Sequence, residues 1–334
     1  MEGNTQVVAN ITGYTIIFIV SLIGNLIISI ITVQKKTGKI PIDILIFALA
    51  ICDLVITFSI PFVAVSVIHP SFPFGIAGCK LLFGLRNVAI YTSTFILLVI
   101  SLERYYATFD LSRSHRNLRI TISFIAVAAI IAFGLTIPQF IVLNLKTIDN
   151  DGAVFCTEIW SINFDASRKV YSMMLFILTF AIPFIIITIT NIVIYYKLFY
   201  AKRKSTMNQM RLKAKRQVVA VMIAVSAVFF ICSLPIYLIN TFNDFKIISQ
   251  SLLVSNVFTW IAYSHTMWNP IIYIVGSSNM RKSCKALLKI DQRNSIISYK
   301  NDRNANSKQN LERIGKVNST NRIAPLKFTR PADE

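Results

Sequence analysis

Charged residues are scarce in this chain, and acidic residues are scarcer than basic ones. Only 15% of its 334 residues are charged, and 15 acidic side chains stand against 34 basic ones, which gives a net charge of +19. Hydrophobic residues make up 54% of the chain, and the mean hydropathy is +0.61. Because a soluble domain of this size carries more charge and less aliphatic bulk, the composition argues against a water-soluble fold.

Residue groups typical of enzymes and nucleic-acid-binding proteins are also missing from the sequence. A basic nucleic-acid binder interleaves charge with polar structure, whereas blocks of about 20 residues here hold almost no charge. The apolar segments contain no nucleophile–base pair, metal cluster or nucleotide loop, and they do not repeat one another. The first ten residues, "MEGNTQVVAN", lack the basic start of a cleavable signal peptide. We therefore expect neither catalysis nor nucleic-acid binding, and we expect the first apolar segment to direct membrane insertion.

Seven apolar blocks are present, each long enough to cross a membrane. A helix needs about 20 residues to span a hydrocarbon core of about 30 Å, and lipid offers no hydrogen-bond partners to an unpaired backbone. The sequence therefore predicts an all-α membrane protein. We expect a seven-helix bundle with a short amphipathic inner helix over 13–289, an extracellular N-terminus over 1–12 and a disordered cytoplasmic tail over 290–334. The blocks run over 13–33, 42–68, 76–102, 119–143, 170–199, 217–240 and 247–275.

Lysine and arginine are distributed unevenly between the connections. They concentrate after the first, third and fifth blocks and in the C-terminal tail, and are few in the other connections. Cytoplasmic connections carry this excess of positive charge, so we expect a multi-pass plasma-membrane protein with its N-terminus outside and its C-terminus inside. The cytoplasmic charge would face anionic membrane lipids and an internal partner.

Three sites of covalent modification are predicted. Cys79 and Cys156 both fall on the extracellular side, where a disulfide is the expected state of two thiols. Cys284 lies in the basic stretch "NMRKSCKALL" at the inner interface and is a candidate for palmitoylation. Asn10 begins the sequon Asn-Ile-Thr and is a candidate for glycosylation, although it lies almost at the membrane.

Polar residues inside the apolar blocks need an explanation, because they are costly to place in lipid. Asp53 lies in the middle of the second block, and Asn25, Ser93 and Asn269 lie in the first, third and seventh. Their oxygens could converge on a hydrated pocket that holds a small hard cation such as Na⁺. The alternative is a polar network that only fixes helix packing.

Short motifs follow one another along the chain in a specific order. Their order and spacing are similar to those of rhodopsin-like G-protein-coupled receptors over about residues 13–289. Each motif alone would recur by chance, and the combination carries the resemblance. The motifs are Gly24-Asn25, "LAICD" (49–53), Cys79, "ERY" (103–105), Cys156, Pro183, "FFICSLP" (229–235) and "NPIIY" (269–273).

The resemblance implies a signalling receptor that activates a heterotrimeric G protein. Glu103 would pair with Arg104 at rest, and Arg104 would turn into a cavity for the Gα subunit on activation. Proline residues weaken the helical ladder and allow segments to pivot. Arrestin and receptor kinases are further possible partners, through Ser and Thr residues of the tail. The implied coupling and switch residues are Glu103, Arg104, Tyr105, Leu111, Phe229, Pro235, Asn269, Pro270 and Tyr273.

The chain departs from the family pattern at several positions. Ser233 replaces the usual Trp before Pro235, and Asn191 replaces the usual Tyr eight residues after Pro183. Lys215 replaces an acidic partner of Arg104, so we expect a weaker resting lock and raised basal signalling. His265 stands where Asn or Ser is usual near the sodium pocket. Because histidine titrates near neutrality, it could make that pocket sensitive to pH.

The ligand is expected to be an extracellular peptide. Arg86 stands where amine receptors have an aspartate, and Tyr263 stands where opsins have the retinal lysine. The segment "FCTEIWS" (155–161) resembles neuropeptide receptors, in a loop long enough for a β-hairpin with "DNDG" as its turn. The predicted ligand contacts are Arg86, Asn87, Ile90, Tyr91, Glu158, Tyr237, Asn240 and Tyr263.

The sequence is also consistent with other ligands and with another function. Acidic residues on the outer side (Asp149, Asp151, Glu158, Asp165 and Asp244) could attract a basic or amidated peptide, or could only keep the loop solvated. Arg86 suits a carboxylate or an amide carbonyl better than a basic group, so a small acid or lipid mediator is the alternative ligand. A more distant alternative is an ion- or proton-conducting seven-helix protein.

Overall fold

The computed structural model describes residues 2–34, 41–68, 71–109, 118–148, 153–160, 165–199, 209–247 and 252–287. Helices dominate this part of the chain, with one two-stranded sheet. The elements are α1 (Glu2–Gln34), α2 (Pro41–Ile68), α3 (Gly75–Phe109), α4 (Leu118–Val142), β1 (Leu143–Ile148), β2 (Ala153–Glu158), α5 (Asp165–Leu175), the π-helical segment η3 (Phe176–Ala181), α6 (Ile182–Phe199), α7 (Gln209–Asp244) and α8 (Leu252–Gly276).

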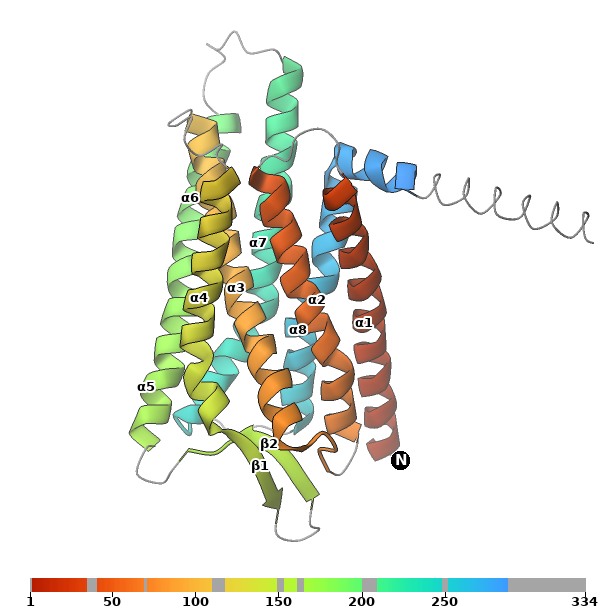
Figure 1. Cartoon of the computed structure of the whole chain (residues 1–334), viewed down its shortest axis with the longest axis vertical. Coiled ribbons are helices and arrows are strands. Elements are labelled where there is room, and N and C mark those ends of the chain that lie inside the picture. Colours follow the sequence, from red (N-terminus) through yellow and green to blue (C-terminus); the bar gives the residue numbers. More distant parts are fainter. Residues whose placement is uncertain are drawn as a thin grey trace, which may run out of the picture. The chain divides into compact units, whose positions relative to one another are not determined.

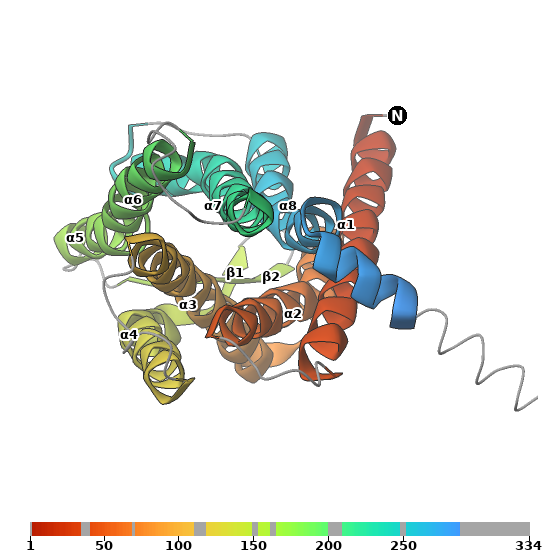
Figure 2. The ribbon, with the colours of Figure 1, turned by 90° about the horizontal axis from the view of Figure 1, so that it is seen from above.

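The helices of residues 2–281 form the predicted seven-helix bundle, because α5, η3 and α6 run on as one membrane-spanning segment (Figure 1). A view along the bundle shows α3 toward its middle, and α3 contacts α2, α4, α6 and α7 (Figure 2). The first helix packs on both α2 and α8 and closes the ring. The bundle end that carries Cys79 is called the outer end below, and the end that carries Glu103 and Arg104 is called the inner end.

Six helical segments of the described chain are long and apolar enough to cross a membrane. The seventh column, α8, is not among them, because Ser, His, Asn and Trp residues interrupt its aliphatic stretches. The polar residues of α8 are those that turn inward: His265, Thr266 and Asn269 are all buried in the bundle. A helix that places polar groups against other helices is expected where a membrane protein holds its functional residues.

The helices extend beyond several of the predicted apolar blocks. The first helix begins at Glu2 and not at residue 13, α3 continues to Phe109, and α7 begins at Gln209. Hydropathy marks where lipid ends, whereas a helix continues into water until its sequence or a turn stops it. A turn with Lys246 in the left-handed region separates α7 from α8, so α8 begins at Leu252. The predicted short helix after the bundle is present over 278–287, and residues 282–287 belong to a second unit.

Pro183 changes the helical geometry of the fifth membrane segment. The sequence predicts a weak point in the hydrogen-bond ladder of this helix. The six residues of η3 come just before Pro183, and the backbone N–H of Ile182 donates to the carbonyl of Ile177, five residues back. A proline ring cannot donate a backbone hydrogen bond, and single π turns accommodate such a defect within a helix.

Close packing at two glycines fixes α8 against its neighbours. A Cβ atom at Gly24 would lie 2.5 Å from the Cγ of Pro270, so α1 and α8 touch where only hydrogen fits. A Cβ atom at Gly276 would lie 2.4 Å from a methyl group of Val221, at the contact between α8 and α7. The inner half of the bundle is filled by a large apolar cluster. Its members include Leu45, Leu49, Ile96, Leu97, Ile100, Val225, Phe229 and Tyr273.

Candidate functional site: an outer cavity and an inner coupling face

The disulfide and the β-hairpin build a lid over the outer end. Cys79 in the first turns of α3 is bonded to Cys156 in β2, with 5.6 Å between the Cα atoms, so this predicted disulfide is confirmed. The predicted hairpin is also confirmed, since β1 pairs antiparallel with β2 and places Cys156 opposite Leu145. Its predicted turn, 149–152, lies outside the described residues.

The hairpin is anchored along β2 as well as through its disulfide. The backbone N–H of Phe72 donates to the carbonyl of Val154 at 2.7 Å, and the N–H of Val154 donates to the Ser71 hydroxyl at 3.1 Å. At the far end of the strand, the N–H of Ile159 donates to the carbonyl of Val142 at 2.8 Å. Glu158 and Trp160 are therefore held in place above the helices.

A cavity of about 310 Å³ lies beneath this lid. All eight residues predicted to contact the ligand line it, from α3, β2, α7 and α8: Arg86, Asn87, Ile90, Tyr91, Glu158, Tyr237, Asn240 and Tyr263. The floor includes Ser233 and His265. Serine stands here where the resembled family has tryptophan, and the cavity extends past it to His265, which was predicted only as a sodium-pocket residue.

Arg86 supplies the positive charge of this cavity. Its Nη1 donates to the Tyr263 hydroxyl at 3.0 Å, and its Nε donates to Oδ1 of Asn87 at 3.2 Å. The guanidinium also lies over the Phe83 ring, 4.8 Å from the centroid. Arginine has five N–H donors, so these neutral partners leave donors for a ligand oxygen. Within the described residues, no carboxylate forms an ion pair with Arg86.

Glu158 supplies the negative charge of the cavity. The side-chain amides of Asn87 and Gln139 lie between it and Arg86. Its carboxylate accepts from Nε2 of Gln139 at 3.3 Å and from Nε1 of Trp160 at 3.0 Å. Oε1 of Gln139 in turn accepts from Nδ2 of Asn87 at 2.9 Å. A relay of neutral amides thus separates Arg86 from Glu158, and the cavity presents two opposite charges to one ligand.

A second chamber of about 300 Å³ adjoins the first and shares Tyr91, Gln139, Glu158, Tyr237 and Asn240 with it. On its outer side, Arg168 lies 2.5 Å from Oδ1 of Asp244, and the Ser172 hydroxyl donates to the same carboxylate. Of the predicted acidic side chains, Glu158 and Asp244 are therefore placed around the cavity. Asp149 and Asp151 lie outside the described residues, and only the backbone of Asp165 is described.

Gln139 and Arg168 also line the second chamber, and neither was among the predicted ligand contacts. Gln139 carried a detectable signal, because it is a polar residue directly after Pro138 in an otherwise apolar membrane helix. Arg168 precedes the fifth apolar block and resembled an ordinary solvated end of a helix.

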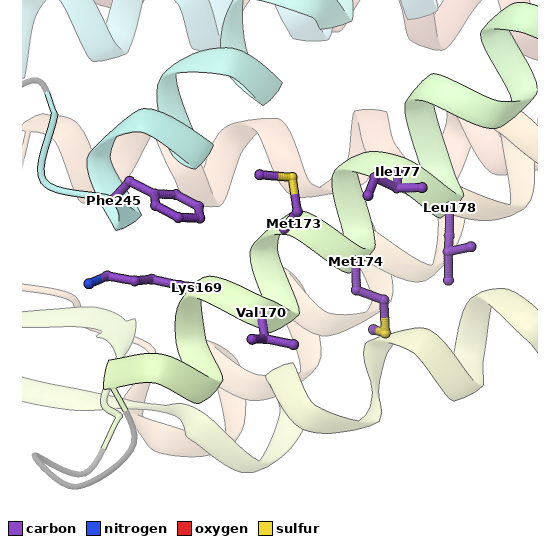
Figure 3. Close-up of a pocket in the computed structure, with 7 residues that line it drawn as sticks. All are labelled: Lys169, Val170, Met173, Met174, Ile177, Leu178 and Phe245. Carbon is purple, nitrogen blue, oxygen red and sulfur yellow. The ribbon is translucent and has the colours of Figure 1, made fainter.

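An apolar depression of about 620 Å³ lies elsewhere, on the outward side of α5 and η3 (Figure 3). It is lined by Lys169, Val170, Met173, Met174, Ile177, Leu178 and Phe245. None of the predicted ligand contacts belongs to it. Its almost wholly apolar lining is what hydrocarbon would contact, and it is separate from the charged cavity in the bundle.

The predicted sodium-pocket residues are all buried, and two of them, Asn269 and His265, contact Asp53. Nδ2 of Asn269 donates to Oδ2 of Asp53 at 2.8 Å, and Nε2 of His265 lies 3.9 Å from Oδ1 of Asp53. Asn25 instead donates to Ser21 and to the carbonyl of Thr266, which ties α1 to α8. This places Asn25 in the packing network that the sequence left as the alternative.

Oxygen atoms in this cluster suit a hard cation. Oδ1 of Asp53, Oγ of Ser93 and Oδ1 of Asn269 are buried and have no hydrogen-bond partner among the described residues. Carboxylate, hydroxyl and amide oxygens are the ligands that such cations take. No group of three or more His, Cys, Asp or Glu side chains in the described chain is arranged to hold a metal ion.

His265 connects this cluster to the outer cavity. Its Nδ1 lies against the carbonyl of Ala262, and its ring packs edge-on against Phe229, with 5.1 Å between the centroids. Phe229 is fully buried, and Pro235 interrupts the same helix six residues later. A ligand on the cavity floor would therefore touch a side chain that also contacts Asp53 and Phe229.

The inner end shows the resting pair expected from the sequence. Arg104 and Glu103 form a salt bridge and a hydrogen bond with each other. One turn earlier, the Ser101 hydroxyl donates to Oδ1 of Asn191 at 3.3 Å and links α3 to α6. Tyr105 packs against Ile194, Leu198 and Val219, between α6 and α7.

Two residues beside Lys215 hold the inner end of α7. Nε of Arg216 donates to the carbonyl of Leu198 at 2.9 Å, and its guanidinium lies 4.8 Å from the centroid of Phe199. Nε2 of Gln217 donates to the carbonyl of Gly276 at 2.7 Å. Lys215 itself is exposed. The Arg216 and Gln217 contacts, called the α7 clasp below, join α7 to α6 and α8 where the family's acidic lock is missing.

Three predicted sites gain little support from the described residues. Asn10 lies inside α1 and is only 6% exposed, so its amide is covered in this structure, and its glycosylation stays a prediction. Cys284 is a free, partly exposed thiol, and its palmitoylation also stays a prediction. Leu111 lies outside the described residues, as does the tail over 290–334.

Comparison with known proteins agrees with this architecture. A model of the 7 transmembrane receptor (rhodopsin family) matches residues 24–273, which is most of the chain. The chain therefore belongs to the rhodopsin family of seven-transmembrane, G-protein-coupled receptors. It is a multi-pass plasma-membrane receptor and not an enzyme.

Several curated relatives are similar over most of their length. Somatostatin receptor type 1 of Rattus norvegicus is 26% identical over 276 residues, which cover 82% of this chain and 70% of the relative. Neuropeptide receptor 22 of Caenorhabditis elegans is 30% identical over 292 residues, which cover 80% of this chain and 67% of the relative. Probable C-C chemokine receptor type 3 of Mus musculus is 27% identical over 286 residues, which cover 80% of this chain and 75% of the relative.

Proposed function

We propose that this receptor binds an extracellular peptide in the outer cavity and activates a heterotrimeric G protein through its inner end. The observation that carries the proposal is the convergence of all eight predicted ligand residues on one lidded cavity, above an intact Glu103–Arg104 pair. The names of the relatives, a somatostatin receptor and a neuropeptide receptor among them, support a peptide ligand. The Lys and Arg distribution supports an extracellular outer end.

The two charges of the cavity define the ligand chemistry. Arg86 fits a peptide carbonyl, C-terminal amide or carboxylate, and Glu158 fits a basic side chain or N-terminus. The amide relay through Asn87 and Gln139 offers further donors and acceptors between them. A ligand with groups of opposite sign at its buried end would pair with both residues, whereas a simple amine would meet Arg86 as a like charge.

A small carboxylate or lipid mediator is the second candidate ligand. The observation that favours it is the state of Arg86, which has hydrogen-bond donors facing the cavity and no ion-pair partner among the described residues. Glu158 is the residue that separates the two candidates. A small acid does not need this carboxylate, whereas a peptide with a basic group does.

The signal would pass from the cavity floor to the inner end through His265. A ligand that displaces His265 alters its contacts with Phe229 and Asp53 at the same time. Pro235 lets the inner part of α7 pivot away from α6 and α8, which opens the α7 clasp. Arg104 would then leave Glu103 and turn toward the Gα subunit. Arrestin and receptor kinases would act on the same open state.

We include an allosteric Na⁺ in this proposal, because buried oxygens of Asp53, Ser93 and Asn269 fit such a cation. When bound, the ion would supply positive charge that stabilises the ionised Asp53 carboxylate inside the bundle. His265 would compete with it, since its Nε2 lies 3.9 Å from the same carboxylate oxygen. Raising the Na⁺ concentration should then lower basal signalling in the wild type and have no effect in Asp53→Asn.

A single screen tests the receptor function and the ligand class together. Cells that express the receptor and a promiscuous Gα reporter are exposed to short peptides, each in amidated and free-acid form, and to small carboxylates. A response that Arg104→Ala abolishes, at equal surface expression, supports G-protein coupling. Lys80, which lies on α3 outside the cavity lining, provides the matched control for the cavity: Arg86→Ala should lose the response and Lys80→Ala should keep it.

Other outcomes would contradict parts of the proposal. A response to small acids that Glu158→Gln leaves unchanged would replace the peptide by the second candidate ligand. Ligand-free current through the expressed protein, without any G-protein signal, would overturn the receptor mechanism in favour of ion conduction.

A further inference from the structure

A cleft of about 650 Å³ separates α6 from α7 on the outside of the bundle, away from the ligand cavity. Its mouth is lined by Ile192, which is 48% exposed, and Ile231, which is 70% exposed. Both residues lie in membrane-spanning segments, so the mouth opens to hydrocarbon and not to water. A ligand of this cleft must therefore arrive from the bilayer. The cleft has the size of typical small-molecule sites.

The interior of the cleft holds two polar side chains that protein contacts do not satisfy. Ser226 is only 4% exposed, and its hydroxyl makes none of the hydrogen bonds found among the described residues. Oδ1 of Asn191 accepts from Ser101, but its Nδ2 donates to no described group. A hydroxyl or amide in apolar surroundings is destabilising unless it is hydrogen-bonded. Hydrogen-bonding groups of a ligand would stabilise both.

Most of the remaining lining is aliphatic or aromatic, and its other hydroxyl groups belong to Thr188, Tyr195 and Tyr196. Phe184 and Phe230 pack edge-to-face with 4.9 Å between their centroids, and Phe180 stacks on Phe184. No charged side chain is among the described residues that line the cleft. A fatty acid or another ionised ligand would thus bury its charge without a partner, so the lining favours a neutral molecule with a rigid apolar body.

The depth of Asn191 and Ser226 in the membrane restricts which classes of ligand can reach them. Asn191 lies six residues before Lys197, or about 9 Å along α6, and Lys197 is the first basic residue after it. A phospholipid cannot bring its headgroup that far into hydrocarbon. A molecule whose only polar group is one hydroxyl can leave the interface when a hydrogen-bonding pair receives that group.

We propose that the cleft between α6 and α7 binds a sterol, with its hydroxyl on Asn191 and Ser226 and its ring system against Phe184 and Phe230. Asparagine occupies position 191 in this chain, where the resembled family carries tyrosine. A phenol ring there would be much larger than the asparagine side chain. The proposal does not depend on which ligand the outer cavity takes.

Photolabelling of the full-length receptor tests this site. The receptor is reconstituted in phosphatidylcholine vesicles that contain a diazirine analogue of cholesterol, irradiated, and digested to map the labelled peptides. We expect saturable labelling of peptides from 180–199 and 219–236, reduced by excess cholesterol.

Two isoleucines on α6 give a matched pair of variants. Ile192→Trp places an indole in the cleft, whereas Ile189→Trp places it on lipid-facing surface, since Ile189 is 58% exposed and outside the lining. Labelling should be lost in the first variant and kept in the second. Asn191→Leu combined with Ser226→Ala keeps the apolar walls, and should weaken labelling about tenfold through lost hydrogen bonds. Unchanged thermal unfolding in sterol-free vesicles would show that these variants fold.

Competition experiments separate recognition of the hydroxyl from simple partitioning. Cholesterol should compete, while cholestane, which lacks the hydroxyl, and oleate should not. Equal labelling of the two tryptophan variants would overturn the site. Equal competition by cholestane would overturn recognition by Asn191 and Ser226, and labelling confined to other helices would overturn the location.

Discussion

Replacing Gln217 with alanine is expected to raise ligand-independent signalling. Gln217 is the part of the α7 clasp that reaches α8, through a hydrogen bond of 2.7 Å from Nε2 to the carbonyl of Gly276. This carbonyl belongs to the last turn of α8, where helices leave backbone oxygens without an internal partner. The bond joins α7 to α8 only while the inner ends of the two helices remain together.

The magnitude follows from this one contact. A neutral hydrogen bond of good geometry contributes about 1 kcal/mol net, and the second contact of Gln217, from Ser278 at 3.4 Å, adds little because it is long. If the bond is present in the resting packing and absent in the active one, its loss shifts the equilibrium by about 1 kcal/mol, or about fivefold. Basal activity should rise by about that factor while the active state remains a minority.

The measurement is constitutive G-protein activation in a reporter assay, at surface expression matched by an epitope tag. Lys213→Ala is the matched control, because Lys213 is exposed and lies on α7 about one turn before Gln217. Gly276→Ala should act in the same direction as Gln217→Ala, since its added Cβ would meet Val221 at 2.4 Å and push α7 away. Basal activity of Gln217→Ala equal to that of the control would refute the clasp as a resting restraint.

Three further predictions concern stability and ligand choice. Gly24→Val should lower the unfolding temperature and surface expression, because its Cβ would lie 2.5 Å from the Pro270 ring, whereas Gly134→Val, with open space around it, should not. Cys79→Ala should lose about 2–5 kcal/mol of unfolding free energy and the fixed lid, measured as reduced ligand binding at the surface. Arg86→Glu should reverse the ligand preference toward basic groups, read from the free-acid and basic members of the peptide panel.

The membrane helices could be predicted because lipid imposes a simple rule on composition. Blocks such as 42–68 and 119–143 agree with α2 and α4 to within a residue or so. The errors occur where helices leave the membrane, as at the end of α3 and the start of α7, because water tolerates a helix without requiring apolar residues. The hairpin was predictable from its turn residues and its cysteine, which together limit how the loop can run.

The cavity residues could be predicted only through the register that the family motifs supply. Arg86 and Tyr263 are placed by counting from Arg104 and Pro270, and the structure brings their side chains within 3.0 Å. Contacts between residues without a motif could not be found in this way. Gln217 looks like any polar residue near a membrane surface, and nothing in the sequence says that it reaches the carbonyl of Gly276.

The polar groups inside the bundle fall into two sets with different physical roles. Some are hydrogen-bonded between neighbouring helices, such as Asn25, whose Nδ2 donates to Ser21 and Thr266 and fixes α1 on α8. Others are buried without a hydrogen-bond partner among the described residues: Oδ1 of Asp53, Oγ of Ser93, Nε2 of His265, Oδ1 of Asn269 and the Tyr273 hydroxyl.

These five atoms lie between the cavity floor at His265 and the inner half of α8 at Tyr273. The other buried atoms without a partner among the described residues belong to Tyr14, Ser29, Arg168 and Trp260. A buried polar atom without a partner is destabilising. A second packing of the helices that gives the five atoms hydrogen-bond partners is therefore stabilised by bonds that the resting packing lacks. Hydrogen bonds that are already formed, such as those of Asn25, would be broken by a rearrangement, so they oppose it. We therefore expect this receptor to change conformation along the line from His265 to Tyr273, where its hydrogen bonds are incomplete, and we expect the α7 clasp to oppose that change at the inner end.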